Sequence, residues 1–255
     1  MRRVRVIPVL TLQNEKLVKT VKFKKPNYIG DPINAVKIFN DKEVDEIVIL
    51  DISATKEKRI PNYNRIEEIA SEAFMPLAYG GGITTFEQIK ELFKLGIEKI
   101  IINSAIENNI SLITQTAERY GSQSVIVAID VKKPMLSMLS AYKNSGSTKI
   151  KSSLLDYLSQ IELAGAGEVF LTAIDRDGTF NDYDYDLINL VASKCSIPVV
   201  SCGGANSIQS FVNAIKSGAS AVAAGSLFVY SSASKGVLIN YPNQSELQKE
   251  LFNKI

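Results

Sequence analysis

PLAYGGGI at residues 76–83 and PVVSCGGA at residues 198–205 share one layout, and they lie 122 residues apart in the chain. In each, a proline opens a short apolar run, where a missing N–H costs a strand least. The apolar residues are consecutive, as in a strand that is buried on both faces. Glycines end the run, and a helical pattern follows at 85–95 and at 208–217. Both stretches therefore predict a strand–turn–helix unit of a parallel sheet.

The same alternation continues along the chain. Short β-branched runs predict strands at 4–10, 46–51, 76–79, 99–103, 124–130, 168–172, 198–201 and 221–224. Helical patterns lie between them at 66–73, 85–95, 111–120, 154–164, 185–194 and 208–217. Eight strand–helix units without a long polar linker predict an α/β fold, a closed (β/α)8 TIM barrel. The length of 255 residues suits one barrel domain over 1–255.

The second half of the chain repeats the first at its strand ends, with separations of 119 to 124 residues. The matched pairs are Leu10-Thr11 with Ile129-Asp130, Asp51 and Ser53 with Asp175 and Asp177, Gly81-Gly82-Ile83 with Gly203-Gly204-Ala205, and Asn103-Ser104 with Gly225-Ser226. Four matches in the same order predict two half-barrels, about 1–122 and 123–240, related by an approximate twofold axis.

The composition indicates a soluble, cytoplasmic protein. The hydrophobic share of 45% and the charged share of 22% exclude the disordered class. A net charge of +2 gives no reason to expect nucleic-acid binding. No apolar run approaches the roughly 20 residues that span a bilayer, and no signal peptide is recognisable, so no membrane association is expected.

The sequence contains no histidine, which removes the commonest general base and metal ligand. Acid–base chemistry must then come from Asp, Glu, Lys, Tyr or Cys. Cys195 and Cys202 form no metal-ligand pattern and are expected to be reduced thiols. We therefore expect neither a metal nor an organic cofactor.

Two polar segments are predicted to be mobile loops that overhang the mouth of the barrel. Residues 12–30 are rich in lysine, and residues 132–153 are rich in Ser, Lys and Gly, including the turn-forming Asn144-Ser145-Gly146. They follow the first and fifth strands, so they occupy equivalent places in the two halves. In a barrel of this kind, such loops border the active site.

Two glycine-rich turns are candidate phosphate sites. Gly80-Gly81-Gly82 follows the third strand and Gly203-Gly204 the seventh. Glycine lets backbone N–H groups approach an anion, and a following helix N-terminus adds its positive dipole end. Each turn could equally be only a tight connection, but each is followed one strand later by a small polar step, Asn103-Ser104 or Gly225-Ser226. The duplicated arrangement favours a ligand with a phosphate at each end.

Asp130 ends the fifth strand and is the candidate acid–base group. A carboxylate in a half-buried apolar setting can have a raised pKa that suits proton transfer. The alternatives are a helix N-cap or an ion pair with Lys132. The equivalent residue in the first half is Thr11, which cannot act as a general acid or base near neutral pH. Residues 175–179 equally fit a structural turn in which Arg176 pairs with a carboxylate.

Four charges lie at strand starts on the opposite, N-terminal rim. They are Arg5, Glu46, Lys99 and Glu168, on the first, second, fourth and sixth strands. Because this rim normally serves stability, a neutral ring that seals the bottom of the barrel is the simplest interpretation from the residues alone.

The motifs at the strand ends resemble those of one family, the cyclase subunit of imidazole glycerol phosphate synthase, from about residue 3 to residue 230. They are RVIP (5–8), GDP (30–32), DI (51–52), GGGI (80–83), NSA (103–105), GSQ (121–123), AID (128–130), GAGE (165–168) and IDRDGT (174–179). The resemblance implies a glutaminase subunit that docks on the N-terminal rim as a heterodimer. Its ammonia would pass through the barrel to a bisphosphorylated substrate, which is closed and cleaved at the C-terminal mouth.

The resemblance also implies roles for individual residues. Asp130 matches one of the family's two catalytic aspartates, and Lys19 matches a loop lysine that closes over substrate. Arg5, Glu46, Lys99 and Glu168 match a charged gate for ammonia. Gly82, Asn103 and Ser104 match one phosphate site, and Asp177, Gly178, Gly204 and Ser226 match the other.

Three departures set the chain apart from the histidine enzyme. Thr11 stands where the family has its other catalytic aspartate, which should cost proton transfer at least ~10²–10⁴-fold. Residues 132–153 depart from the family's usual pattern. The tail at 237–242, together with 22–24 and 28–31, resembles instead a paralogous branch associated with amidation of surface-glycan sugars.

The main hypothesis is therefore a synthase subunit of that branch, with reduced or altered cyclase activity. It would receive ammonia through the barrel, bind a bisphosphorylated or related phosphosugar ligand, and serve a separate sugar amidotransferase. One alternative is a true cyclase–lyase of histidine biosynthesis that uses Asp130 and a substitute for the missing aspartate. The other is a non-catalytic scaffold that activates the glutaminase.

Overall fold

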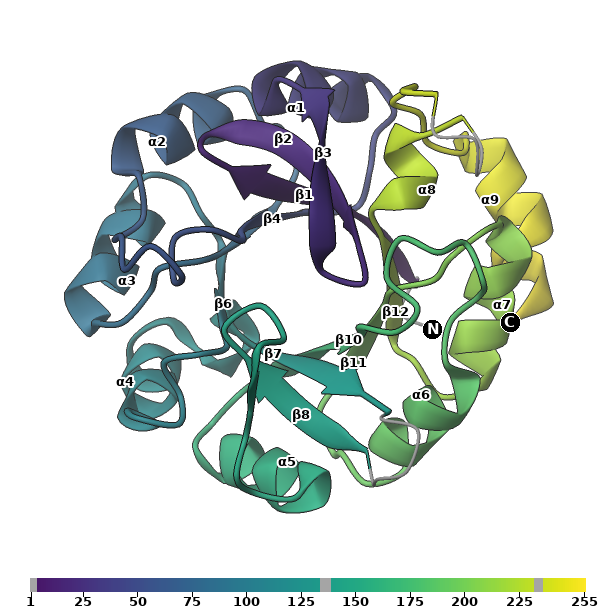
Figure 1. The fold of residues 1–255 in the computed structure, drawn as a ribbon. Coiled ribbons are helices and arrows are strands. Elements are labelled where there is room, and N and C mark those ends of the chain that lie inside the picture. Colours follow the sequence, from purple (N-terminus) through teal and green to yellow (C-terminus); the bar gives the residue numbers. More distant parts are fainter. Residues whose placement is uncertain (1–3, 134–138, 232–235) are drawn as a thin grey trace.

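A computed structural model describes residues 4–133, 139–231 and 236–255 of the chain. Over these residues, eight parallel strands close into a barrel and confirm the predicted fold (Figure 1). In order around the barrel they are β1 (Arg5–Gln13), β4 (Ile47–Asp51), β5 (Leu77–Gly80), β6 (Lys99–Ile102), β7 (Val125–Lys132), β10 (Glu168–Ala173), β11 (Val199–Cys202) and β12 (Ala221–Ala224). Closure is completed where β12 pairs with β1, with Arg5 opposite Ala221 and Pro8 opposite Ala224.

Helices surround the barrel (Figure 1). They are α1 (Pro32–Asp41), α2 (Tyr63–Ser71), α3 (Phe86–Lys94), α4 (Ser111–Tyr120), α5 (Leu154–Leu163), α6 (Tyr185–Ala192), α7 (Ile208–Lys216), α8 (Ser226–Val229) and α9 (Gln244–Glu250), with short 3-10 turns at Ser122–Ser124 and Phe252–Lys254. Helix α3 shows how the local sequence sets a boundary. Thr85 and Gln88 form a capping box at its start, which satisfies backbone N–H groups that have no partner within the helix.

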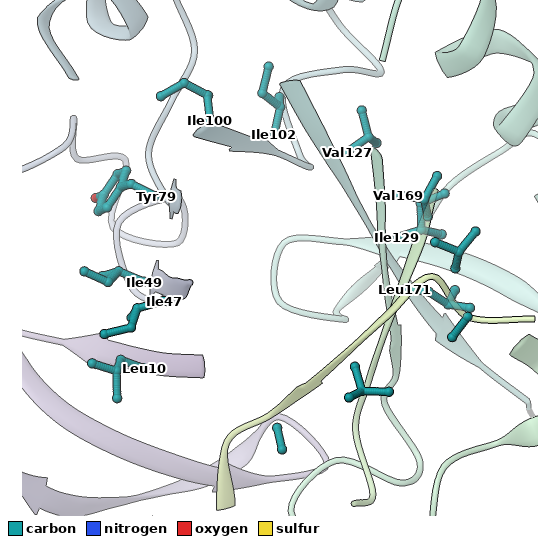
Figure 2. Packing of buried hydrophobic residues seen from close by; sticks show 14 of the residues in the cluster. Leu10, Ile47, Ile49, Tyr79, Ile100, Ile102, Val127, Ile129, Val169 and Leu171 are labelled. Carbon is teal, nitrogen blue, oxygen red and sulfur yellow. The ribbon is translucent and has the colours of Figure 1, made fainter. Parts of the chain in front are cut away.

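The strands carry apolar side chains on both faces. On the outer face they pack against the helices, and Figure 2 labels several, including Leu10, Ile49 and Tyr79. On the inner face a separate cluster fills the barrel and contains many small residues: Ile7, Val9, Val48, Ala78, Ile101, Ile126, Ala128, Phe170, Val200, Cys202, Ala221 and Ala223. Burial on both faces explains why the strand sequences are continuously apolar instead of alternating.

The prediction of mobile loops at 12–30 and 132–153 is wrong for the described parts of both segments. Residues 12–30 extend β1 and add β2 (Lys16–Val21) and β3 (Lys24–Gly30), an antiparallel hairpin that lies over the mouth of the barrel (Figure 1). The second segment extends β7 and adds β8 (Ser140–Lys143) and β9 (Thr148–Lys149). Residues 134–138 of that segment lie outside the described residues.

The residues in the turns of the β1–β2–β3 segment explain why glycine content did not predict these hairpins. Asn14 and Glu15 both have positive φ, and so do Lys22 and Phe23, as the two-residue turns of twisted hairpins require. Lysine and phenylalanine seldom adopt that conformation, so the second turn gives no compositional signal. Asn144-Ser145-Gly146 does form the turn that its composition predicts, with all three residues at positive φ.

Candidate active site

A cavity of about 330 Å³ opens at the C-terminal ends of the strands, and both hairpins contribute to its walls. That volume lies in the range of small-molecule sites. The cavity brings together many of the candidate residues: Thr11, Lys19, Gly82, Asn103, Ser104, Asp130 and Asp177. Gly178, Gly204 and Ser226 line a second, smaller cavity instead. The four rim charges lie at the other end of the barrel.

Asp130 lies near the end of β7, and the amide of Asn103 donates to its carboxylate at 3.3 Å. Burial raises the pKa of Asp130 to about 7, and the nearby charge of Asp177 adds to the effect. A hydrogen bond with Thr172 and the charge of Lys132 act in the opposite direction. The carboxyl group is therefore poised to give or take a proton near neutral pH.

The two structural alternatives for Asp130 do not describe its surroundings. The residue lies within a strand and not at a helix N-terminus. The ammonium of Lys132 donates to the carbonyl of Gly146 and lies 4.7 Å from the centre of the Tyr142 ring.

Thr11 faces the same cavity from β1. Its hydroxyl donates to the carbonyl of Val18 in β2 and so ties the hairpin to the strand. A threonine hydroxyl that is held in this hydrogen bond does not act as a general acid or base. The two matched positions, Thr11 and Asp130, thus lie at equivalent strand ends with different chemistry.

Lys19 lies on the strand β2 instead of a loop, and it is only 7% exposed. Its ammonium reaches down into the barrel and donates to the carbonyl of Val9 at 2.6 Å. Burial lowers the pKa of Lys19, while the carboxylate of Asp177 works against that change.

The first candidate phosphate site borders the large cavity. Gly81 and Gly82 have φ of 127° and 70°, and a Cβ on Gly82 would lie 2.6 Å from the carbonyl oxygen of Arg59. The glycines are therefore also needed for close packing of the turn. The hydroxyl of Ser104 accepts a hydrogen bond from the Asn144 backbone at 3.0 Å and donates to Asn103. Asn103 in turn holds Asp130, so its amide is directed at the carboxylate.

The second candidate site is nearly closed. Its cavity, about 10 Å³, has room for roughly one water molecule. The hairpin β2–β3 packs against its Asp177-Gly178 border: the Lys22 N–H donates to the carbonyl of Asp177 at 2.9 Å, and a Cβ on Gly178 would lie 2.3 Å from the Thr20 oxygen. Arg176 donates to the Asn181 carbonyl within the turn at 2.9 Å.

The four rim charges form a closed ring of ion pairs. Arg5 contacts Glu46 at 2.5 Å and also pairs with Glu168. Lys99 contacts Glu46 at 2.7 Å and Glu168 at 3.6 Å. Both carboxylates are buried, and Oε1 of Glu46 has no hydrogen-bond partner among the described residues. One acceptor of the ring is thus unused.

Several residues that line the cavity were not predicted from the sequence. Lys56 and Lys143 lie on segments without a recognisable motif, and Lys143 pairs with Glu107. Thr172 and Cys202 could have been found from strand periodicity, since each follows an inward-facing residue, Phe170 or Val200, by two positions. Among the described residues, no cluster of three or more His, Cys, Asp or Glu side chains could hold a metal ion. No helix in the described part of the chain is long and apolar enough to cross a membrane.

A (β/α)8 barrel with a mouth cavity, a carboxyl group of raised pKa and a buried amine belongs to the class of barrels that are built for small-molecule chemistry. The chain belongs to the histidine biosynthesis protein family, whose model matches residues 5–234. The resemblance to imidazole glycerol phosphate synthase subunits is therefore confirmed at the level of the family.

Relatives in three bacteria agree with this assignment. A Pseudomonas aeruginosa protein provisionally named imidazole glycerol phosphate synthase subunit hisF2 is 48% identical over 246 residues, 96% of this chain and 98% of the relative. A Vibrio vulnificus protein with the provisional name subunit hisF3 is 45% identical over 256 residues, 98% and 97% of the two chains. The imidazole glycerol phosphate synthase subunit HisF of Alkaliphilus metalliredigens is 38% identical over 231 residues, 90% and 92% of the two chains.

Proposed function

We propose that this chain is an ammonia-handling synthase subunit of the imidazole glycerol phosphate synthase type, and that it serves amidation of glycan sugars. It receives ammonia from a glutaminase at the N-terminal rim and passes it through the barrel to a phosphosugar ligand in the mouth cavity. The observation that carries the proposal is the placement of the charged ring and the Asp130 cavity at opposite ends of one barrel.

The barrel interior supports passage of a small neutral molecule. Between the ring and the mouth, the inner wall is apolar, and Ala78, Ala128, Ala221 and Ala223 contribute only methyl groups to it. Neutral ammonia carries no charge to desolvate in such a lining, whereas an ion would.

The N-terminal side of the barrel suits a docked partner. Phe74, between α2 and β5, is 88% exposed, and Leu163, the last residue of α5, is 89% exposed. Both precede strands, so they border the rim that carries the ring. Both apolar side chains are available for contact with a docked protein. The glutaminase is the partner that fits this position, with a sugar amidotransferase as a further member of the assembly.

The residues at the mouth favour a reaction of ammonia that differs from the ring closure and cleavage of the histidine enzyme. Ring closure and cleavage need proton transfers on both sides of the ligand, and Asp130 supplies one acid–base group. Thr11 cannot supply the other, so we expect a loss of at least ~10²–10⁴-fold in cyclase rate. The greater similarity to the two provisionally named relatives than to the Alkaliphilus HisF also supports a separate branch.

The experiment compares the chain and its Thr11→Asp variant, each with a glutaminase partner. We expect the native chain to pass amide nitrogen from ¹⁵N-glutamine to a sugar acceptor through the amidotransferase, and not to restore growth of a cyclase-deficient histidine auxotroph. Thr11→Asp should raise formation of imidazole glycerol phosphate. Robust complementation by the native chain would instead support the true cyclase–lyase.

A specific observation keeps that second candidate open: the buried amine of Lys19 lies in the mouth beside Asp177 and could replace the missing acid. The scaffold hypothesis is not favoured, since a barrel that only activates a glutaminase needs no cavity of about 330 Å³ around a proton-exchanging group. If phosphorylated ligands failed to bind at millimolar concentration, the scaffold would become the better description.

A further inference from the structure

Lys19 places a buried amine in the mouth cavity. The residue lies on β2, it is buried, and it lines the cavity. A Cβ on Gly225, directly after β12, would collide with its nitrogen, so glycine at that position is what leaves room for the amine. The hairpin and the end of β12 together hold this nitrogen where the barrel interior meets the mouth.

The surroundings of the Lys19 nitrogen favour its neutral form. The nitrogen donates one hydrogen bond, to the Val9 carbonyl at 2.6 Å. The carboxylate of Asp177 attracts it through space, but in the described part of the chain the two form no ion pair. Because burial outweighs this attraction, the pKa of Lys19 is lowered. A neutral amine has a free electron pair and is a nucleophile, whereas an ammonium group is not.

The rest of the cavity supplies an apolar wall and a proton donor. Val9, Ile101 and Phe170 line the cavity and belong to the apolar cluster inside the barrel. Asp130 lines the same cavity, and its pKa of about 7 lets its carboxyl group hold a proton near neutral pH. Apolar walls limit the water that would hydrolyse a C=N bond. The cavity thus combines what imine formation needs: an amine, an acid and restricted water.

The first candidate phosphate turn lies on the other side of the mouth. Strand β12, which precedes Gly225, and strand β6, which precedes Asn103, are separated by β1, β4 and β5 around the barrel. In a barrel of eight strands, these two ends face each other. A ligand whose phosphate lies at Gly82 and Asn103 would therefore extend across the cavity toward Lys19.

We propose that Lys19 is a covalent binding site for an open-chain sugar phosphate, and that its amine forms an imine with the carbonyl carbon of that ligand. The choice of substrate class rests on the proposed function, which places a phosphosugar in this cavity. The nitrogen of Lys19 attacks the carbonyl carbon, and a C–N bond forms while a proton passes from nitrogen to the carbonyl oxygen. The oxygen then leaves as water with a proton from Asp130. The resulting C=N bond carries a positive charge that Asp177 attracts.

Such an intermediate would prepare the ligand for ammonia. The carbon of a protonated imine is more electrophilic than a carbonyl carbon, so ammonia from the barrel adds to it. Breaking the bond to the lysine nitrogen then releases Lys19 as a neutral amine, and the Asp130 carboxylate takes back its proton. The ligand has exchanged its carbonyl oxygen for nitrogen, with loss of water, and no oxidant or reductant is consumed.

The imine can be trapped on the isolated chain. The probe is D-ribulose 5-phosphate, whose ketone cannot close a furanose ring because the C5 oxygen carries the phosphate, and sodium cyanoborohydride reduces any imine to a stable amine. Near neutral pH, the adduct should form on Lys19 at least ~10-fold faster than on the exposed Lys24, since each unit by which the pKa is lowered gives tenfold more neutral amine. Peptide mass spectrometry locates the adduct. Labelling of Lys24 with Lys19 unmodified overturns the proposal.

Two matched substitutions test the amine itself. Lys19→Met keeps an unbranched apolar side chain without the amine, and it should abolish the fast adduct. Lys24→Met removes an exposed lysine of the same hairpin and should leave the labelling of Lys19 unchanged. An equal yield of fast adduct in Lys19→Met and in the native chain would show that another group reacts, contrary to the proposal.

Two further small molecules test the ligand class. Dihydroxyacetone has a ketone without phosphate, and ribitol 5-phosphate has the phosphate without a ketone. At equal concentration, dihydroxyacetone should label Lys19 more slowly than D-ribulose 5-phosphate does. Ribitol 5-phosphate should leave no adduct and should slow labelling by the probe. Equal labelling by the two ketones, together with no protection by ribitol 5-phosphate, would exclude a sugar phosphate as the ligand.

The labelling of the native chain is decisive even if Lys19→Met does not fold, because it requires no variant. It also uses neither glutaminase nor amidotransferase, so its outcome is separate from that of nitrogen transfer. Failed nitrogen transfer in a chain whose Lys19 is labelled would contradict the proposed function alone. Unlabelled Lys19 in a chain that passes nitrogen would contradict the imine alone.

Discussion

Asp130→Asn should stabilise the protein in a strongly pH-dependent manner. In the folded chain the pKa of Asp130 is raised from 3.8 to about 7, chiefly by burial. The folded state therefore holds a proton that the unfolded state releases between these values. Below pH 3.8 the side chain of Asp130 is protonated in both states and does not change the free energy of unfolding. That free energy falls as the pH rises toward 7, because the carboxyl group must then ionise in a site that disfavours its charge.

The size of the effect follows from the two pKa values. Their difference corresponds to about 4 kcal/mol at pH 8, and partial exposure of the side chain makes this an upper limit. Asparagine keeps the shape of the side chain, and its oxygen can still accept from Asn103. The substitution thus removes the charge with little other change.

Urea unfolding of both proteins from pH 5 to pH 8.5 measures the difference directly. The gain from Asp130→Asn should be small at pH 5 and should grow to a few kcal/mol at pH 8. Asp186→Asn, on the exposed face of α6, is the matched control and should give a flat difference. Parallel pH profiles for the native and Asp130→Asn proteins would show that the carboxyl group is not desolvated in the way described.

Two further perturbations test the rim and the hairpin. Glu46→Gln leaves Arg5 and Lys99 short of one carboxylate, and we expect a loss of about 3 kcal/mol in unfolding free energy. In the assembled complex it should also lower glutamine-dependent nitrogen transfer more than transfer from added ammonium salts; an equal drop in both would contradict a gating role. Lys22→Asn should stabilise the chain by up to about 1 kcal/mol, because asparagine tolerates the positive φ of 52° at that position. Lys24→Asn in β3 serves as its control, and equal denaturation midpoints for the two variants would refute the turn argument.

The barrel could be predicted because its strands are buried on both faces, and consecutive apolar residues in the sequence indicate such strands. The hairpins could not, because Lys22 and Phe23 form a turn without glycine or asparagine, and because Lys16 and Lys19 of β2 lie three positions apart and do not give the alternation typical of a strand. The location of Asp130 and Thr11 followed from strand ends. The burial of Lys19 did not, since it depends on the hairpin folding back and on the space beside Gly225.

The two glycine-rich turns differ in their surroundings although their sequences match. Gly82 and Gly204 match in sequence, yet the first borders an open cavity and the second a nearly filled one. The hairpin contacts Asp177-Gly178 at the border of the second cavity, and these contacts join residues more than 150 positions apart. No local pattern encodes such a contact.

The ring at the N-terminal rim has a consequence for how the two halves could have come together. By the spacing of the repeat, Glu46 corresponds to Glu168, whereas Arg5 and Lys99 correspond to Ser124 and Ala221. Each half thus supplies one acid, and the first half alone supplies both bases. Two copies of the first half would enclose four cations with two carboxylates, and two copies of the second would enclose two carboxylates with no cation. Either assembly would bury uncompensated charge. By charge, the two predicted halves complement each other at this rim, and neither could form a neutral ring with a copy of itself.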